Sequence, residues 1–284
     1  MNIIHAIILG TVQGLTEFVP VSSSGHLVLL HRVFGINEPT LFFDVMLHIG
    51  TLLAVFIVLW RDIWGLLRRP IQGLTGFLIL GTLPIVFAAL FFRKPLEEAF
   101  TTGQFLGFAF LMTSAILCIA ERLIRKAKKA EAENAGADKA GTIGTENPWQ
   151  TMTWKDALAV GAMQAIAIIP GLSRSGATIT GALGRKLNRD LAARFSFLLS
   201  IPAILGALVL QLMELARGGD LNPAAGIGIG AFIAGTISAA IVGFFAVRFM
   251  LKIIREKSLF YFALYTAVLG ILVLIDQFGT HFFF

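Results

Sequence analysis

Long apolar runs alternate with short polar segments along this chain of 284 residues. Several runs are about 20 residues long, the length that an α-helix needs to cross a hydrocarbon layer of roughly 30 Å. The runs lie at 41–60, 73–92, 104–123, 192–213, 225–250 and 258–277. The pattern therefore predicts an all-α polytopic membrane protein with about six transmembrane helices.

Two further apolar regions, 1–34 and 155–184, are interrupted by Gly, Pro and Ser. The first contains QGLTEFVPVSSSGH (13–26) and the second PGLSRSGATIT (170–180). Five positions of the first region match five of the second at a constant spacing: Gly10, Gln13, Ser22, Ser24 and Gly25 match Gly161, Gln164, Ser173, Ser175 and Gly176. Because three spans follow each copy, the second copy enters the membrane from the opposite side. This arrangement predicts an inverted-topology repeat.

Irregular backbone at membrane depth is tolerated only where protein or a polar cavity surrounds it. We therefore expect two re-entrant helical hairpins, one from each side, which carry the motifs and meet inside the bundle. The predicted organisation is a first membrane repeat at 1–123, a cytoplasmic linker at 124–154 rich in Ala, Gly and mixed charge, and a second, inverted repeat at 155–284. The N-terminal region lacks signal-peptide features, so we expect it to be retained.

Composition and charge agree with a membrane protein. Hydrophobic residues make up 56% of the chain and charged residues 14%, which excludes an ordinary soluble domain. The net charge of +6 does not indicate nucleic acid, because the basic residues gather on one predicted side of the membrane. These clusters lie at 61–69, 122–129, 185–189 and 252–257. The positive-inside rule places them in the cytoplasm and the C-terminus outside.

Glu17 is the carboxylate of the first motif, and Gln13 lies one helical turn before it on the same face. A carboxylate inside a membrane costs about 2.5–3.5 kcal/mol on insertion scales, which usually marks a functional residue. Glu17 and Gln13 could hold a divalent cation, or Glu17 could act as a general base. The structural alternative is that Glu17 pairs with an arginine or with the backbone.

Each motif also predicts a helix start, at SSSG and at SRSG, where unpaired N–H groups and the helix dipole favour phosphate. Arg174 could hold phosphate oxygens with both arms of its guanidinium group. We expect a set of polar and glycine residues to bind a phosphate-containing substrate: Gln13, Ser22, Ser24, Gly25, Ser173, Ser175, Gly176 and Thr178.

His26 shares a helical turn with three serine hydroxyls. It could deprotonate a serine, protonate a leaving oxygen, or itself attack phosphorus. The other histidines lack comparable polar neighbours in the sequence, so we predict structural or interfacial roles for them: His5, His31, His48 and His281.

The two motifs resemble those of the bacterial undecaprenyl-diphosphate phosphatases, also called bacitracin-resistance proteins. The resemblance extends over essentially the whole chain, including FSFLLSIPAI at 195–204. It implies hydrolysis of undecaprenyl diphosphate to undecaprenyl phosphate and phosphate, which recycles the lipid carrier for peptidoglycan, with help from Mg²⁺ or Ca²⁺. It also implies the bacterial cytoplasmic (inner) membrane, a catalytic pocket that faces outside, and an arrangement that allows a homodimer.

The resemblance implies catalytic roles for Glu17, Ser23, His26 and Arg174. We favour Ser23 as the nucleophile with His26 as its acid/base partner, while direct attack by His26 is the competing hypothesis. Gln13 stands where many members of the family carry Glu, which leaves more of any metal-binding role to Glu17. An alternative function is an inverted-repeat transporter or lipid flippase, because broken helices are typical of transporters.

Overall fold

A computed structural model describes residues 1–36, 41–92, 102–134, 148–216 and 227–284. All regular structure within these ranges is helical. Five of the described helices are long and apolar enough to cross a membrane, or six if the bent pair α3 and α4 counts as one span. The long helices are α3 (Leu41–Val58) with α4 (Trp60–Arg68), α5 (Gly73–Phe91), α7 (Leu106–Asn134), α10 (Arg189–Ala216), α11 (Ile229–Glu256) and α12 (Phe260–Ile275). The prediction of an all-α polytopic membrane protein is confirmed.

Two of these helices depart from their predicted bounds. The first predicted span bends by 81° after Val58, and α4 continues as a short amphipathic helix. The second departure lies at the start of the predicted linker, where α7 continues to Asn134. Ile124 is still packed in the core, and the Ala-, Lys- and Glu-rich residues that follow are good helix formers. The rest of the linker holds a short 3-10 helix, η1 (Pro148–Thr151), while 135–147 lies outside the described residues.

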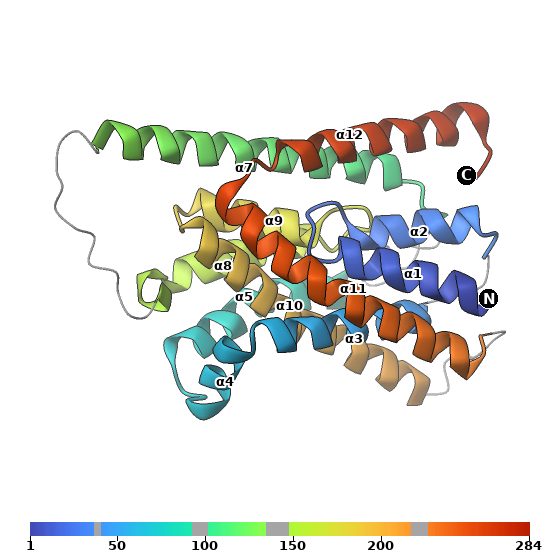
Figure 1. Cartoon of the computed structure of the whole chain (residues 1–284), viewed down its shortest axis with the longest axis horizontal. Helices are drawn as coiled ribbons and strands as arrows, with labels where there is room; N and C mark the ends of the chain where they lie inside the picture. The colour runs from blue at the N-terminus through green and yellow to red at the C-terminus, as the bar shows by residue number, and fades with distance from the viewer. Residues whose placement is uncertain (37–40, 93–101, 135–147, 217–226) are drawn as a thin grey trace.

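Two hairpins of short helices carry the motifs. The first consists of α1 (Ile3–Thr16) and α2 (Ser23–Val33), and the second of α8 (Trp154–Ile166) and α9 (Arg174–Gly184). The longest of these, α1, has 14 residues and is only about 21 Å long, too short to cross the bilayer alone. The hairpins enter from opposite ends of the molecule, and their tips meet in the middle (Figure 1). This is the predicted re-entrant arrangement.

Each hairpin is held by a long helix from the other half of the chain. Helix α1 packs along α11, and α8 packs along α5. Gly10 meets the backbone of Gly235 and Gly161 meets that of Gly81, with no room for a β-carbon at either contact. Gly10 and Gly161 are positions that the sequence repeat pairs. The repeat that the motifs predict therefore also appears in the packing of the helices.

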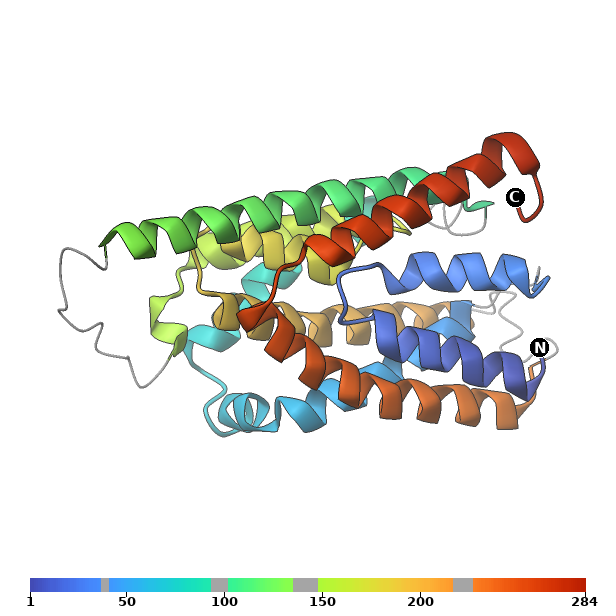
Figure 2. The same cartoon turned by 45° about the horizontal axis from the view of Figure 1, so that its top comes forward.

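The remaining helices enclose the hairpins. The largest hydrophobic cluster surrounds α9 and α10 and includes the fully buried rings of Phe18, Phe195 and Phe197. Helices α7 and α12 lie side by side across one face, as Figures 1 and 2 both show. At its outer end the second hairpin is anchored by Asp156, which caps α8 and accepts a 2.6 Å hydrogen bond from Arg185. Packing and capping together set the position of both hairpin tips.

Candidate active site

The two hairpin tips are built in the same way. Ser22 caps α2 by accepting a hydrogen bond of 3.3 Å from the backbone N–H of Gly25. Ser173 caps α9 by accepting one of 3.1 Å from the N–H of Gly176. The predicted helix starts at SSSG and SRSG are therefore confirmed. Both helices point their positive ends at the centre of the molecule.

The two hairpin tips are also hydrogen-bonded to each other. Ser175 donates to the carbonyl of Val19 at 3.3 Å, and the N–H of Gly171 donates to the Ser24 hydroxyl at 3.5 Å. Ser22 has a positive φ of 71°, a conformation that costs energy for a residue with a side chain. Neighbouring contacts must hold this turn in place, and strained turns of this kind cluster at functional sites.

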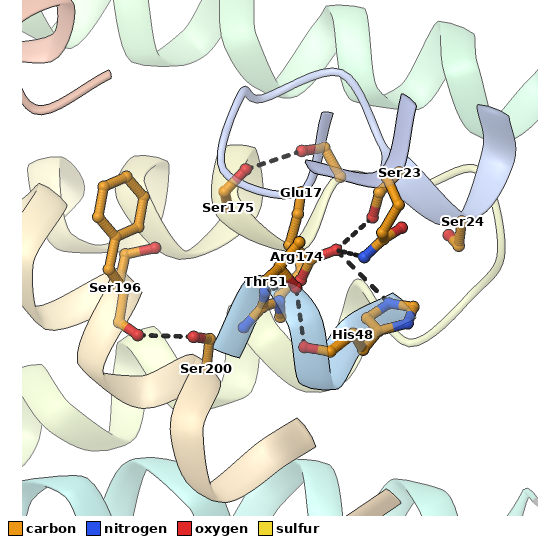
Figure 3. A network of polar contacts seen from close by, with 12 residues as sticks. Glu17, Ser23, Ser24, His48, Thr51, Arg174, Ser175, Ser196 and Ser200 are labelled. Atoms are coloured by element: carbon orange, nitrogen blue, oxygen red, sulfur yellow. Dashed lines mark hydrogen bonds and ion pairs between the residues drawn. The ribbon is translucent and has the colours of Figure 1, made fainter. Parts of the chain in front are cut away.

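Glu17 lies at the point where the tips meet, immediately after α1, and is only 5% exposed. Its Oε2 accepts hydrogen bonds from the Ser23 hydroxyl at 2.5 Å and from the Gln13 amide at 2.9 Å. Its Oε1 accepts one from the guanidinium of Arg174 (Figure 3). Ser23 is the first residue of α2 and Arg174 the first of α9. The carboxylate therefore lies between two helix N-termini that both favour an anion.

His48 of α3 completes this cluster. Its Nε2 lies 3.5 Å from Oε2 of Glu17, and its Nδ1 lies 2.7 Å from the backbone oxygen of Asp44. Because a carbonyl only accepts, Nδ1 carries a hydrogen, and Nε2 can donate to Glu17 only in the imidazolium form, in which both nitrogens carry one. The sequence predicted a structural or interfacial role for His48, but the structure places its ring beside Glu17 on the cavity wall. Asp44 and His48 are one helical turn apart in an apolar span, and ionisable residues at membrane depth are a functional signal that the sequence contained.

A cavity of about 320 Å³ opens beside Glu17. One part of its wall is polar and consists of Glu17, Ser22, Ser23, Ser24, Asp44, His48, Ser173 and Arg174. The other part is apolar and consists of Leu27, Val28, Val45, Ala167, Ile168, Leu172, Ala203, Ile204 and Ala207. Such a cavity suits a ligand with a charged head and a hydrocarbon tail.

Two polar atoms of this cluster have no hydrogen-bond partner among the described residues. They are Nη1 of Arg174 and Oε1 of Gln13, and both atoms are buried. Arg174 uses only Nη2 on Glu17, so Nη1 remains for another acceptor. A buried donor without a partner costs about 1–3 kcal/mol, which an anionic ligand would offset.

His26 does not line this cavity. Its Nδ1 lies 2.6 Å from the backbone oxygen of Ser22, and its Nε2 lies 2.8 Å from the hydroxyl of Tyr265 on α12. The ring also packs edge-on against Phe110 of α7. Both nitrogens of His26 have partners other than Ser23, and they tie α2 to its own tip and to α12, so its acid/base role stays a prediction.

The remaining predicted phosphate-binding residues lie behind the cavity wall. They are Gln13, Gly25, Ser175, Gly176 and Thr178. Gln13 orients Glu17, and Thr178 bonds to Ser196 of α10 at 2.5 Å. In this structure these residues support the groups that reach the cavity: Ser22, Ser23, Ser24, Ser173 and Arg174, together with Glu17.

The donor set does not fit a preformed divalent-cation site. Glu17 and Gln13 are the predicted ligands, but the carboxylate oxygens of Glu17 already accept from an arginine, a serine and an amide. Within the described ranges no group of three or more His, Cys, Asp or Glu residues could hold a metal ion. The two helix N-termini and Nη1 of Arg174 give the polar wall donors for an anion.

Comparison with known proteins agrees with this geometry. The model of the family "Bacitracin resistance protein BacA" matches residues 6–272. An undecaprenyl-diphosphatase of Carboxydothermus hydrogenoformans is 44% identical over 278 residues, with 98% of both chains covered. "Undecaprenyl-diphosphatase 4" of Bacillus thuringiensis subsp. konkukian is also 44% identical, with the same coverage. "Undecaprenyl-diphosphatase" of Methanosphaera stadtmanae is 37% identical over 297 residues, with 97% of this chain and 98% of the relative covered. This chain belongs to the bacitracin resistance protein BacA family.

Proposed function

We propose that this protein is an undecaprenyl-diphosphatase, which hydrolyses undecaprenyl diphosphate to undecaprenyl phosphate and inorganic phosphate. Curated relatives of this name match nearly the whole chain. The observation that carries the proposal is the two-part cavity, in which Ser23, Glu17 and Arg174 form a polar wall beside an apolar one. Hydrolysis of this substrate returns the lipid carrier to use, and an abundant enzyme would confer the bacitracin resistance for which the family is named.

The cavity can recognise both parts of such a substrate. The N-termini of α2 and α9 and the free Nη1 of Arg174 provide donors for the terminal phosphate. Ala203 and Ala207 of α10 leave room for the start of a prenyl chain along the apolar wall. The rest of the chain would lie between helices in contact with lipid.

Ser23 is the proposed nucleophile, because its hydroxyl both lines the cavity and donates directly to Glu17. Its oxygen bonds to the terminal phosphorus, and its proton passes to the Glu17 carboxylate. The anhydride P–O bond breaks, and undecaprenyl phosphate leaves with the bonding electrons. Glu17 passes that proton to solvent. Water then attacks the phosphoserine, its oxygen bonds to phosphorus, one of its protons returns to the Ser23 oxygen, and phosphate is released. Arg174 and the helix N-termini stabilise the charge on the transferred group.

The two alternatives have less support. Direct attack by His26 would require its ring to leave the contacts with Ser22 and Tyr265. A transporter or flippase is favoured only by the inverted repeat, and no feature of the described cavity favours it over hydrolysis.

The chain is a multi-pass membrane protein, and we place it in the bacterial cytoplasmic (inner) membrane with the cavity open to the outside. The basic clusters and the positive-inside rule support this orientation. A requirement for Mg²⁺ or Ca²⁺ and a homodimer both remain predictions.

The test is phosphate release by the purified protein in detergent, where no compartments exist. We expect the wild type to release phosphate from undecaprenyl diphosphate and Ser23→Ala to lose turnover while it still binds substrate. Ser258→Ala, outside the cavity, is the matched control and should keep its activity. If Ser23 served only as a hydrogen-bond donor, its loss would cost about ten- to two-hundred-fold in rate. An acid-labile, base-stable phosphoenzyme would indicate phosphohistidine and exclude the serine mechanism.

A further inference from the structure

His48 is the one group of the Glu17 cluster that comes from a long helix and not from a hairpin. Ser23, Gln13 and Arg174 belong to the hairpins, whereas His48 lies within α3. Its ring is held from behind by the bond to the backbone of Asp44, so Nε2 points at Glu17 and at the cavity. His48 is therefore a fixed support for the Glu17 carboxylate, whereas Ser23 and Arg174 take part in the proposed reaction.

Arg174 cannot bind Glu17 and the substrate equally strongly. A diphosphate carries more negative charge than a carboxylate, and it would draw the guanidinium away from Oε1 of Glu17. Ser23 must at the same time pass its proton along its hydrogen bond to Oε2 as its oxygen attacks. Glu17 thus loses the contact with Arg174 at the moment when it accepts the proton of Ser23.

We infer that His48 is a positioning residue that holds the Glu17 carboxylate against Ser23 while Arg174 is engaged with the phosphate. The inference rests on the proposed function, since it concerns the same reaction. His48 acts as an imidazolium whose Nε2 donates toward Oε2, the oxygen of Glu17 that Ser23 also contacts. Gln13 holds that oxygen from the opposite side, so the two residues fix its position.

The experiment compares kcat and KM for undecaprenyl diphosphate in the wild type, His48→Ala and His48→Gln. Because His48 acts in the bound complex, His48→Ala should lower kcat by about tenfold or more and change KM by less than about threefold. The glutamine amide can also donate to Oε2, so His48→Gln should restore kcat to within about threefold of the wild type. His5→Ala is the control, because His5 stacks on Phe34 outside the cavity.

Thermal unfolding in detergent separates this role from a structural one, since both variants should unfold within a few degrees of the wild type. The inference is overturned if His48→Ala keeps its kcat, if it raises KM alone, or if folded His48→Gln is as slow as His48→Ala. A wild type that releases no phosphate would overturn the proposed function together with this inference. A normal wild type with an unaffected His48→Ala would overturn the inference alone.

Discussion

At the scale of single residues, the chemistry depends on how one buried carboxylate is compensated. Glu17 accepts from Ser23, Gln13 and Arg174 and lies near His48, which repays the cost of burying its charge. Removing one partner from a buried ion pair typically costs about 3–5 kcal/mol, because the other charge is left unpaired. The same donors favour a phosphate. In the unliganded site Arg174 pairs with Glu17, and the phosphate of a bound substrate would compete with this carboxylate for the guanidinium group.

Arg174→Lys tests bidentate recognition at this scale. Lysine keeps the charge but offers a single ammonium in place of the planar fork, so it cannot hold two phosphate oxygens bidentately. We expect the rate of phosphate release to fall by at least about tenfold. Arg125→Lys is the matched control, because the Arg125 side chain is mostly exposed and pairs with Glu121 outside the cavity. Full activity of Arg174→Lys would contradict the proposed role of the guanidinium group.

At the scale of the helices, the position of the site depends on how closely the hairpins approach their partner helices. Membrane helices associate through packing and not through exclusion of water, so small residues at the contact matter. The two hairpins pack against their partner helices through equivalent close contacts, Gly10 on Gly235 and Gly161 on Gly81. Glu17 follows directly after α1, so a displaced α1 would move the carboxylate away from Ser23.

Gly10→Ala and Gly161→Ala test these close contacts. A β-carbon at either position would meet backbone atoms that cannot rotate away, so the helices must separate. We expect each variant to lose about 1–3 kcal/mol of stability, measured by unfolding in detergent, with reduced phosphate release. Gly206→Ala, on α10 in open space, should be neutral or slightly stabilising. Equal behaviour of all three variants would show that the close contacts carry no energy.

At the scale of the whole molecule, the two halves are inverted and interleaved. The described N- and C-terminal residues lie at one end, whereas the C-terminal part of α7 and η1 lie at the other (Figure 1). Because the site is made of both hairpin tips, neither half contains it alone. Glu17 and Ser23 come from one half and Arg174 from the other.

Cysteine labelling of intact cells tests this orientation. In a variant that lacks Cys118, an impermeant reagent should modify Thr280→Cys and spare Ala140→Cys, because the basic clusters place the linker in the cytoplasm. Permeabilised cells, in which both positions should react, provide the control. Labelling of position 140 alone in intact cells would reverse the predicted orientation, and labelling of both positions would contradict the odd number of spans between them.

Sequence analysis was sufficient to predict the class of fold, the re-entrant hairpins and the helix starts at their tips. These features follow from local signals: the length of apolar runs, the capping serines, and a repeat that sets the parity of spans. Sequence analysis missed the extent of α7, because helix propensity continues beyond the apolar run.

Only the tertiary structure decided which histidine reaches the site. His26 is close to Ser23 in the chain, but its position on α2 turns it toward Tyr265 and Phe110. His48 is distant in the chain, yet the packing of α3 in the bundle brings it to Glu17. Adjacency along a helix specifies only the direction of a side chain from its own axis. What that side chain meets depends on the helices packed around it.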